Sequence, residues 1–459
     1  MNHIKKFSLS GLAVILLSIF IIFNPDSGLD IFSFLLISFI ILQKIFGEYF
    51  ILVLLAFRPT LDYWRDYHIF SARFFDFNIN AALSLFLLIW SVIFFAKNYE
   101  YFKTIPYKIA WLVFIAWCSF SIFYTYNLSS TMVETVKLSS LFSLFGISYI
   151  MSKKDKDKFK NTFLKSMLIG AIAPITLSFY QLTTKTGMSI DEISNRIYGT
   201  FAHPNVLATF ALLLLIVLVN EFINTKKEDT KKINLLKFLG IILLATITFT
   251  YTRIAWIGTI VLFLSIGLIY YRKILLYVLG AIILFYVIFY PTNSYLATNY
   301  NINLQSNSLI NRLTNRNPDS DSISWRTEVL TKVIPLFRKK YLIGYGYGTF
   351  PRVWDDNKDI KNIWDNTSEA HNDYIKIAVE SGIIGLILFV IIFASLLYNQ
   401  IITTFKTNFK NIVFLTSILI YLILSLSDNM LHHTPVIWWF WAVWGMWSNE
   451  TKNHPERVT

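Results

Sequence analysis

The sequence predicts an all-α polytopic integral membrane protein with about 12–14 transmembrane helices of roughly 20 residues each. Of its 459 residues, 55% are hydrophobic and only 15% are charged, and the mean hydropathy is +0.53. Soluble domains carry about 25% charged residues. Apolar runs also recur along the whole chain, separated by polar stretches. Composition and pattern together exclude an ordinary soluble domain.

The apolar runs give the order of the predicted helices. Lys5 and Lys6 precede the first run, but no small-residue cleavage site follows it, so we interpret it as a retained first span. The runs at 30–43 and 45–57 fit either a short hairpin of two spans or one long tilted helix. The predicted runs are 8–23, 30–43, 45–57, 81–96, 108–126, 136–151, 162–182, 204–222, 235–252, 254–271, 273–291, 373–398, 410–427 and 434–448.

Basic residues are distributed unevenly over the loops between these runs. With the N-terminus inside, the inner loops are rich in lysine, whereas the short outer loops carry few basic residues. This asymmetry follows the positive-inside rule and places the long loop outside the cytoplasmic membrane. Most of the net charge of +13 therefore reports topology, and no nucleic-acid partner is expected. The single cysteine, Cys118, cannot form a disulfide within the chain.

The chain divides into four predicted parts. Residues 1–195 form N-terminal transmembrane helices, and residues 196–291 form central transmembrane helices with outward arginine motifs. Residues 292–372 form a long extracytoplasmic loop with short helices. Residues 373–459 form the C-terminal transmembrane helices.

The short outer loops are richer in arginine than in lysine. Because arginine presents a planar fork that grips phosphate in two places, this set indicates an anionic ligand at the outer leaflet. Alternatively, these arginines contact lipid headgroups or pair with nearby carboxylates such as Asp62 and Glu134. Arg253 has the stronger functional case, because it lies in a very narrow break between apolar runs, where an ionisable group is costly. The outer arginines are Arg58, Arg65, Arg73, Arg196 and Arg253.

A second outer motif begins at Arg196 and ends in the next apolar run. Pro204 suits the first turn of a helix, where its missing N–H is not needed. His203 comes directly before this proline. We therefore predict that His203 caps a helix end at the outer surface and orients the loop through hydrogen bonds.

The long loop contains a predicted amphipathic helix over 324–337. Trp325, Val329, Val333 and Leu336 share one face of it. Ser324 is a suitable N-cap residue. We expect this helix to lie on the outer membrane surface with Arg326 near its start.

A glycine-aromatic stretch and a histidine follow in the same loop. The stretch 344–348 is not a phosphate-binding loop of the usual kind; it predicts a turn that passes close to another segment, with tyrosines offering stacking faces for sugars. The segment 367–369 suits a helix N-cap, which places His371 in the first turns of the following helix. A helix N-terminus attracts anions and favours the neutral imidazole that a general base needs.

No metal or other cofactor is expected. The segment 319–321 resembles the acidic metal motif of nucleotide-sugar transferases, but nucleotide sugars are cytoplasmic and this loop is predicted to be outside. His432 and His433 lie beside Asp428, yet no third ligand is near them in the sequence.

These motifs together resemble the C-terminal domain shared by the O-antigen ligase and polymerase superfamily. The resemblance extends over about 196–390 and includes the motif 196–207, the stretch Thr252-Arg253-x-Ala-Trp-x-Gly, and Arg326. Its core is Gly-x-Gly-x-x-x-Phe, then Ala-His-Asn, then Glu-x-Gly-x-x-Gly. Here these residues are Gly344, Gly346, Phe350, Ala370, His371, Asn372, Glu380, Gly382 and Gly385.

The resemblance implies a metal-independent membrane glycosyltransferase. Such proteins transfer a glycan from a polyprenyl (undecaprenyl) diphosphate carrier to an acceptor hydroxyl on a glycan or lipid, outside the cytoplasmic membrane. The resemblance thus implies a multi-pass protein of the bacterial cytoplasmic (inner) membrane, with its active site on the extracytoplasmic face. His371 would then be the catalytic base, and Arg253, Arg326 and Arg196 would bind the diphosphate. Attack opposite the leaving group would invert the anomeric centre. Supporting roles would fall to Asn372, Glu369, Gly344, Gly346 and His203.

The sequence leaves several alternatives open. The protein is either a polymerase of capsule, exopolysaccharide, teichuronic-acid or O-antigen repeats, or a ligase that moves finished chains to an acceptor. A transporter or flippase for the same lipid-linked glycan is the alternative, although its charges should follow a path through the membrane. A non-catalytic scaffold in a polysaccharide assembly complex is a third interpretation. The sequence gives neither the sugar, the linkage and the acceptor nor the oligomeric state.

Overall fold

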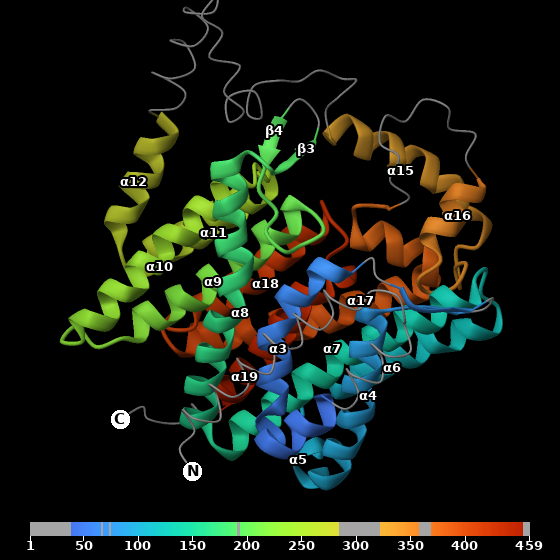
Figure 1. Cartoon of the computed structure of the whole chain (residues 1–459), viewed down its shortest axis with the longest axis horizontal. Helices are drawn as coiled ribbons and strands as arrows, with labels where there is room; N and C mark the ends of the chain where they lie inside the picture. Colours follow the sequence, from blue (N-terminus) through green and yellow to red (C-terminus); the bar gives the residue numbers. More distant parts are fainter. Residues whose placement is uncertain are drawn as a thin grey trace, which may run out of the picture.

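A computed structural model describes residues 38–65, 68–72, 75–190, 193–283, 322–357 and 369–452. The predicted run 8–23 lies outside these residues, as does the greater part of the run 30–43. Residues 284–321 also lie outside them. The described chain is a helical membrane protein, as predicted (Figure 1). Within the described ranges, 7 helices are long and apolar enough to cross a membrane, and Lys108–Phe123, Arg253–Ile269 and Ile412–Ser425 are shorter apolar helices.

The first part of the chain, as far as residue 283, contributes most of the helices. They are η1 (Gly47–Tyr49), α3 (Phe50–Leu61), η2 (Asp62–Trp64), α4 (Ile79–Lys97), α5 (Tyr99–Lys103), α6 (Lys108–Phe120), η3 (Ser121–Phe123), α7 (Leu128–Lys154), α8 (Lys156–Thr184), α9 (Pro204–Asn224), α10 (Thr230–Phe249), α11 (Arg253–Ile269) and α12 (Arg272–Ile283). The later helices are α15 (Ser322–Lys339), α16 (Phe350–Asp356), α17 (Asp373–Lys406), α18 (Ile412–Ser425), η6 (Met430–His432) and α19 (Thr434–Lys452).

Two short antiparallel hairpins join helices and were not predicted. Strand β1 (His68–Ala72) pairs with β2 (Phe75–Asn78), and β3 (Met188–Ile190) pairs with β4 (Ile193–Arg196). Their strands are too short to give an alternating pattern that stands out from the apolar runs beside them.

The chain turns sharply between the helical residues 38–46 and α3. Gly47 has φ +58°, a left-handed conformation that glycine adopts without strain. The ring centroids of Phe39 and Phe50 are 5.2 Å apart, whereas eleven residues of straight helix would separate their Cα atoms by about 16 Å. This turn, within the apolar stretch Ser38–Trp64, favours the hairpin interpretation of the 30–57 region.

The tryptophan-rich helix α19 lies in the core of the bundle. Trp438, Trp439, Trp441, Trp444 and Trp447 are each at most 1% exposed. α19 packs along α7, where a Cβ on Gly445 would come within 2.1 Å of the Phe145 carbonyl oxygen. A helix that is apolar on all sides is stable only when neighbours surround it, and here α19 organises the bundle.

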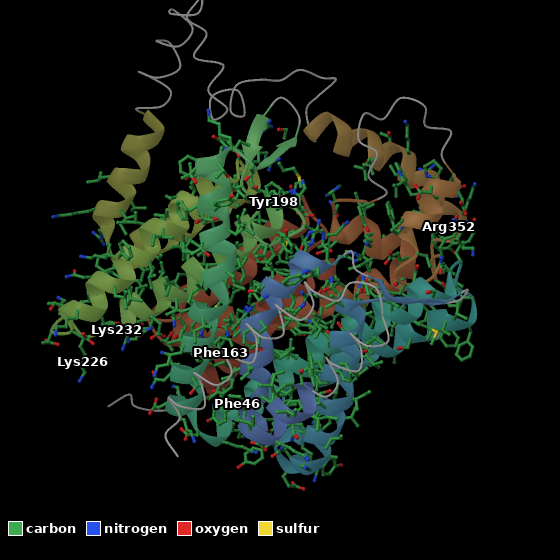
Figure 2. All side chains as sticks on the ribbon, viewed as in Figure 1. Phe46, Phe163, Tyr198, Lys226, Lys232 and Arg352 are labelled. Carbon is green, nitrogen blue, oxygen red and sulfur yellow. The ribbon has the colours of Figure 1, made fainter. Side chains whose placement is uncertain are left out.

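The lysine-rich loops and the arginine-bearing loops gather at opposite ends of the bundle. At one end, Lys154 pairs with Glu48 at 2.9 Å, and Lys160 pairs with Glu221 at 2.6 Å. At the other end, the Thr200 hydroxyl donates to the Pro59 carbonyl at 2.7 Å. Figure 2 shows Lys226 and Lys232 on the far side of the molecule from Arg352. The predicted topology expects such a separation, and which end faces the cytoplasm stays a prediction.

Helix α15 forms as predicted but packs on protein. Val329, Val333 and Leu336 are buried with Trp354 of α16 and Val379 of α17 in a small separate core. This apolar face therefore packs on α16 and the start of α17, which offer an apolar surface that buries it. The position of the helix on the outer membrane surface stays a prediction. The side chains of Ser324, Trp325 and Arg326 lie outside the described residues.

Candidate functional site

The site is built around the N-terminus of α17. Asn372 is the N-cap, and its side-chain oxygen accepts a hydrogen bond from the Ile375 backbone N–H at 3.1 Å. The prediction that 367–369 caps this helix is wrong, because the closer Asn372 satisfies the free N–H of the first turn. His371 therefore precedes the helix, with φ +45°. A left-handed non-glycine residue costs of order 1–3 kcal/mol and persists only where its surroundings hold it.

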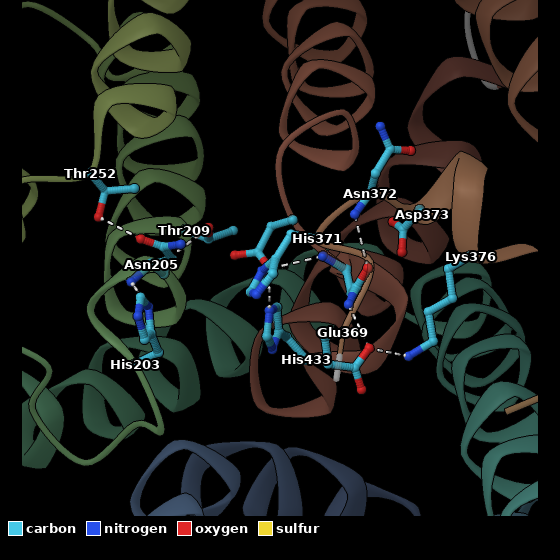
Figure 3. A network of polar contacts seen from close by, with 12 residues as sticks. His203, Asn205, Thr209, Thr252, Glu369, His371, Asn372, Asp373, Lys376 and His433 are labelled. Atoms are coloured by element: carbon cyan, nitrogen blue, oxygen red, sulfur yellow. Dashed lines mark hydrogen bonds and ion pairs between the residues drawn. The ribbon is translucent and has the colours of Figure 1, made fainter. Parts of the chain in front are cut away.

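His371 meets two residues of the loop between α18 and α19. Its Nδ1 lies 3.5 Å from Asp428 Oδ1, and His433 Nε2 lies 3.1 Å from the same oxygen. Figure 3 shows the His371 and His433 imidazoles converging. The His371 side chain is 22% exposed and that of Asp428 is 7% exposed. A buried carboxylate thus backs an imidazole that a ligand can reach.

This arrangement favours one tautomer of His371. An ionised carboxylate only accepts hydrogen bonds, so the proton of a neutral His371 belongs on Nδ1, facing Asp428. The lone pair then lies on Nε2, which is the form that a general base requires. Contacts of this kind are often long before a substrate binds.

The charges of Asp428 and His433 are coupled. Burial by itself would raise the pKa of Asp428, but His433 and then His371 hold it well below its ordinary value. Burial alone would lower the pKa of His433, but Asp428 raises it above its ordinary value. Asp428 is therefore ionised, and the neighbouring His433 compensates for the burial of its negative charge.

His203 lies within electrostatic reach of this group and caps α9, as predicted. Its Nδ1 accepts a hydrogen bond from the Asn205 backbone N–H at 3.2 Å, with Pro204 in the first turn. Burial lowers the pKa of His203 to about 3, Arg196 adds to the effect, and Asp428 opposes it. His203 is thus neutral. Figure 3 draws it with Asn205 and Thr252 beside the His371 group.

Arg196 is buried between three segments. Its Nε donates to the Thr250 carbonyl at 2.9 Å, and one Nη faces Asn205 Oδ1 at 3.3 Å and Thr252 Oγ1 at 3.4 Å. These bonds tie β4 to the starts of α9 and α11, so Arg196 organises the site in this structure. Its role towards a diphosphate stays a prediction.

The other predicted cations are placed differently. Arg253 is the first residue of α11, next to Thr252, and is partly exposed. Arg326 belongs to the first part of α15, but its side chain lies outside the described residues. Arg58 is buried, 3.5 Å from Asp62 Oδ1 and 2.6 Å from Thr434 Oγ1, so the pairing interpretation holds for it. The side chain of Arg73 also lies outside the described residues.

The glycine stretch 344–348 is a close backbone contact, as predicted. Gly344 has φ +72°, and a Cβ on it would lie 2.3 Å from the Glu380 carbonyl oxygen. On the other side of the contact, Gly382 has φ +67° and interrupts α17. Tyr345 and Tyr347 are only 8% and 7% exposed. The prediction that these tyrosines offer stacking faces to sugars is therefore wrong, because both rings are buried in the hydrophobic cores of the protein.

Glu380 supports the same contact from α17. Its Oε1 accepts a hydrogen bond from the Phe350 backbone N–H at 3.0 Å, at the start of α16. The glycine stretch, α16 and α17 are thereby joined, and this unit supports the segment that ends at His371.

Sequence reasoning considered Asp428 only beside a possible metal-binding histidine pair and missed its contact with His371, and it missed Asn429 altogether. Their signal was an acidic residue directly after an apolar run and close to a histidine pair. The two histidines face different carboxylates: His433 faces Asp428, and His432 Nδ1 lies 3.2 Å from Glu134 Oε2. Among the residues that the structure describes, no group of three or more His, Cys, Asp or Glu side chains is arranged to hold a metal ion.

The fold and the site define a polytopic membrane protein with a His–Asp–His centre where its arginine-bearing loops meet. Residues 238–390 match the family model described as O-Antigen ligase. This match supports the resemblance of these residues to the O-antigen ligase and polymerase superfamily. No curated protein matches the chain.

The match covers Arg253, the glycine stretch and His371 but is shorter than the resemblance expected over 196–390. Arg196, His203, Asp428 and His433 lie outside it. The fold itself brings Asp428, with His433 bound to it, to His371, and it places His203 beside Arg196 and within electrostatic reach of the same group.

Proposed function

We propose that the protein is a membrane glycosyltransferase that moves glycan units from a polyprenyl (undecaprenyl) diphosphate carrier to an acceptor hydroxyl. It acts outside the cytoplasmic membrane, as a polysaccharide polymerase or an O-antigen-type ligase. The observation that carries the proposal is the partly exposed His371 imidazole, backed by the buried Asp428 at 3.5 Å. It lies inside the segment that matches the O-Antigen ligase model.

His371 acts as general base in this mechanism. Its Nε2 takes the proton of the acceptor hydroxyl while the acceptor oxygen bonds to the anomeric carbon. The bond from that carbon to the carrier phosphate breaks, and its electron pair leaves with the diphosphate. Attack from the opposite face inverts the anomeric centre. Base catalysis of this kind contributes roughly 10²–10⁴-fold, and Asp428 stabilises the imidazolium that forms.

The leaving diphosphate requires fixed positive charge. Arg253, at the N-terminus of α11, and Arg326, on α15, are proposed to bind it, because guanidinium groups can neutralise developing charge where other enzymes use a divalent metal. The reaction would then need no metal. Arg196 holds the segment before Arg253 through Thr250 and Thr252 and serves as a further candidate.

The remaining predicted residues are proposed to support the site. Asn372 and Glu369 hold the start of α17 against the loop that carries Asp428. His203 fixes the start of α9 beside Arg196. Gly344 and Gly346 allow the close packing of the glycine stretch on its neighbours.

The test is His371→Ala in the native host, with gel profiles of the surface polysaccharide and of its lipid-linked precursors. Loss of long chains, with single repeats accumulating on the carrier, indicates a polymerase. Full-length chains stranded on the carrier indicate a ligase. A normal profile at normal protein level would refute the catalytic role and favour the transporter or scaffold interpretation. Asn357→Ala is a matched control, because this asparagine is exposed at the end of α16.

A further inference from the structure

The side-chain amide of Asn429 lies between the start of α17 and the loop that carries Asp428. Its Oδ1 accepts a hydrogen bond from the Asn372 backbone N–H at 3.0 Å, and its Nδ2 donates to Glu369 Oε2 at 2.7 Å. Asn429 is only 3% exposed, and both bonds are partly buried, although the Glu369 side chain is 27% exposed. The amide therefore joins two chain segments that are far apart in the sequence.

The partners of this amide fix its orientation. A carboxylate such as Glu369 only accepts hydrogen bonds and a backbone N–H only donates them, so Nδ2 must face Glu369 and Oδ1 must face Asn372. Burial alone would raise the pKa of Glu369, but Lys376, whose Nζ lies 2.7 Å from Oε2, holds it below the ordinary value. Glu369 thus stays ionised and keeps the amide in place.

The backbone of Asn429 controls the carboxylate next to it. Its N–H donates to Asp428 Oδ1 at 2.8 Å. The same oxygen lies 3.5 Å from His371 Nδ1 and 3.1 Å from His433 Nε2. Whatever holds the Asn429 backbone against α17 therefore also sets the direction in which Asp428 faces His371.

We infer that Asn429 is a positioning residue for His371. Its amide links Glu369 and Asn372 to the Asp428 loop and so sets the distance between the Asp428 carboxylate and the His371 imidazole. The expected effect of Asn429 on the reaction rate rests on the proposed function, whereas its effect on the position of Asp428 relative to His371 does not. Asn429 also lies outside the segment that matches the O-Antigen ligase model.

The first test is Asn429→Ala in the full-length protein in lipid nanodiscs, with lipid-linked glycan extracted from the host as donor. A displacement of about 1 Å at a catalytic group costs roughly 10²-fold in rate. We expect kcat to fall by about 10–10²-fold with KM changed by less than about twofold. The rate at which diethyl pyrocarbonate carbethoxylates His371, followed by peptide mass spectrometry, should change as well, because the reagent attacks imidazole nitrogens. Asn357→Ala should alter neither quantity.

A polarity swap breaks the same hydrogen bond in a single variant and restores it, with donor and acceptor exchanged, in a double variant. In Asn429→Asp, two carboxylates face each other and the contact with Glu369 is lost. Adding Glu369→Gln supplies an amide donor to the new carboxylate, while the Asn372 N–H keeps its acceptor. We expect the double variant to recover at least about tenfold of the activity that Asn429→Asp loses, because contacting residues are coupled. This variant also carries the test if Asn429→Ala does not fold.

The outcomes separate the inference from the proposed function. Unchanged kcat, KM and His371 carbethoxylation in a folded Asn429→Ala variant would overturn the positioning role, as would a double variant no better than Asn429→Asp. If His371→Ala keeps full transfer activity while Asn429→Ala alters the carbethoxylation of His371, the proposed function fails and the positioning role stands.

Discussion

The His371 imidazole and the Asp428 carboxylate lie 3.5 Å apart, although the whole of α17 and α18 separates them in the sequence. The two helices return the chain to the same end of the bundle, so a residue just before one and a residue just after the other become neighbours. The carboxylate gives the histidine a defined tautomer, and the predictions below depend on this contact.

Asp428→Asn should abolish most glycan transfer. The amide keeps the shape of the side chain but can turn its NH₂ group towards His371, which then loses its preference for the proton on Nδ1. Loss of the equivalent carboxylate costs about 10⁴-fold in a serine protease triad, so we expect a loss of roughly 10²–10⁴-fold in kcat. The measurement is transfer from extracted lipid-linked glycan by the purified variant. An Asp428→Asn variant with near-normal kcat would refute the role of this carboxylate.

The pair of Asp428 and His433 should make stability depend on pH in a defined window. The folded-state pKa of Asp428 is depressed, so its contribution is present above the unfolded value of about 3.9 and is lost as pH falls through the folded value. The pKa of His433 is raised, so its contribution is complete below about 6.5 and is lost as pH rises through the folded value.

We therefore expect the largest contribution between about pH 4 and 6.5. Thermal unfolding of the wild type and of an Asp428→Asn, His433→Gln double variant, measured across pH 3 to 9, checks this. The difference in melting temperature should peak inside that window. A difference that does not vary with pH would contradict the ionic coupling.

Gly344→Ala should destabilise the protein through its backbone. Position 344 has φ +72°, and the new Cβ would overlap the Glu380 carbonyl, only 2.3 Å away. The left-handed conformation alone costs a non-glycine residue of order 1–3 kcal/mol, so a lower melting temperature and lower yield are expected. Gly240→Ala is the control, because a Cβ there meets nothing within 4 Å and alanine favours the helix α10. Equal melting temperatures for both variants would contradict the close contact.

Arg253→Lys should retain only part of the activity, although it keeps the charge. Lysine offers a compact ammonium in place of a planar fork, so it cannot bind a diphosphate in two places. We expect a loss of about tenfold or more in kcat/KM for the lipid-linked donor, and a larger loss for Arg253→Ala. Arg352→Ala should leave kcat/KM unchanged, because this exposed side chain pairs with Asp356 on α16. Equal activity of wild type and Arg253→Ala would exclude the diphosphate role.

Several parts of the site were predictable from local pattern. The Pro204 first turn, the His203 cap and the helix over 324–337 each follow from neighbouring residues, and the structure shows all of them. The N-cap before α17 was placed too early, because more than one polar residue there could cap the helix and only the folded chain selects Asn372. The burial of Tyr345 and Tyr347 was also missed, since it depends on what packs against the glycine stretch.

The sequence by itself determined the class of protein, the approximate order of the helices and the placement of His371 near the start of α17, because hydrophobicity, charge bias and capping act over a few neighbouring residues. Only the tertiary structure decided which polar groups share a site. Asp428, Asn429 and His433 reach His371 because α17 and α18 return the chain to one end of the bundle. The buried position of Arg196 likewise depends on three segments that meet only in the fold. Contacts between distant segments depend on how the helices pack, and the packing cannot be derived from the residues next to each position in the sequence.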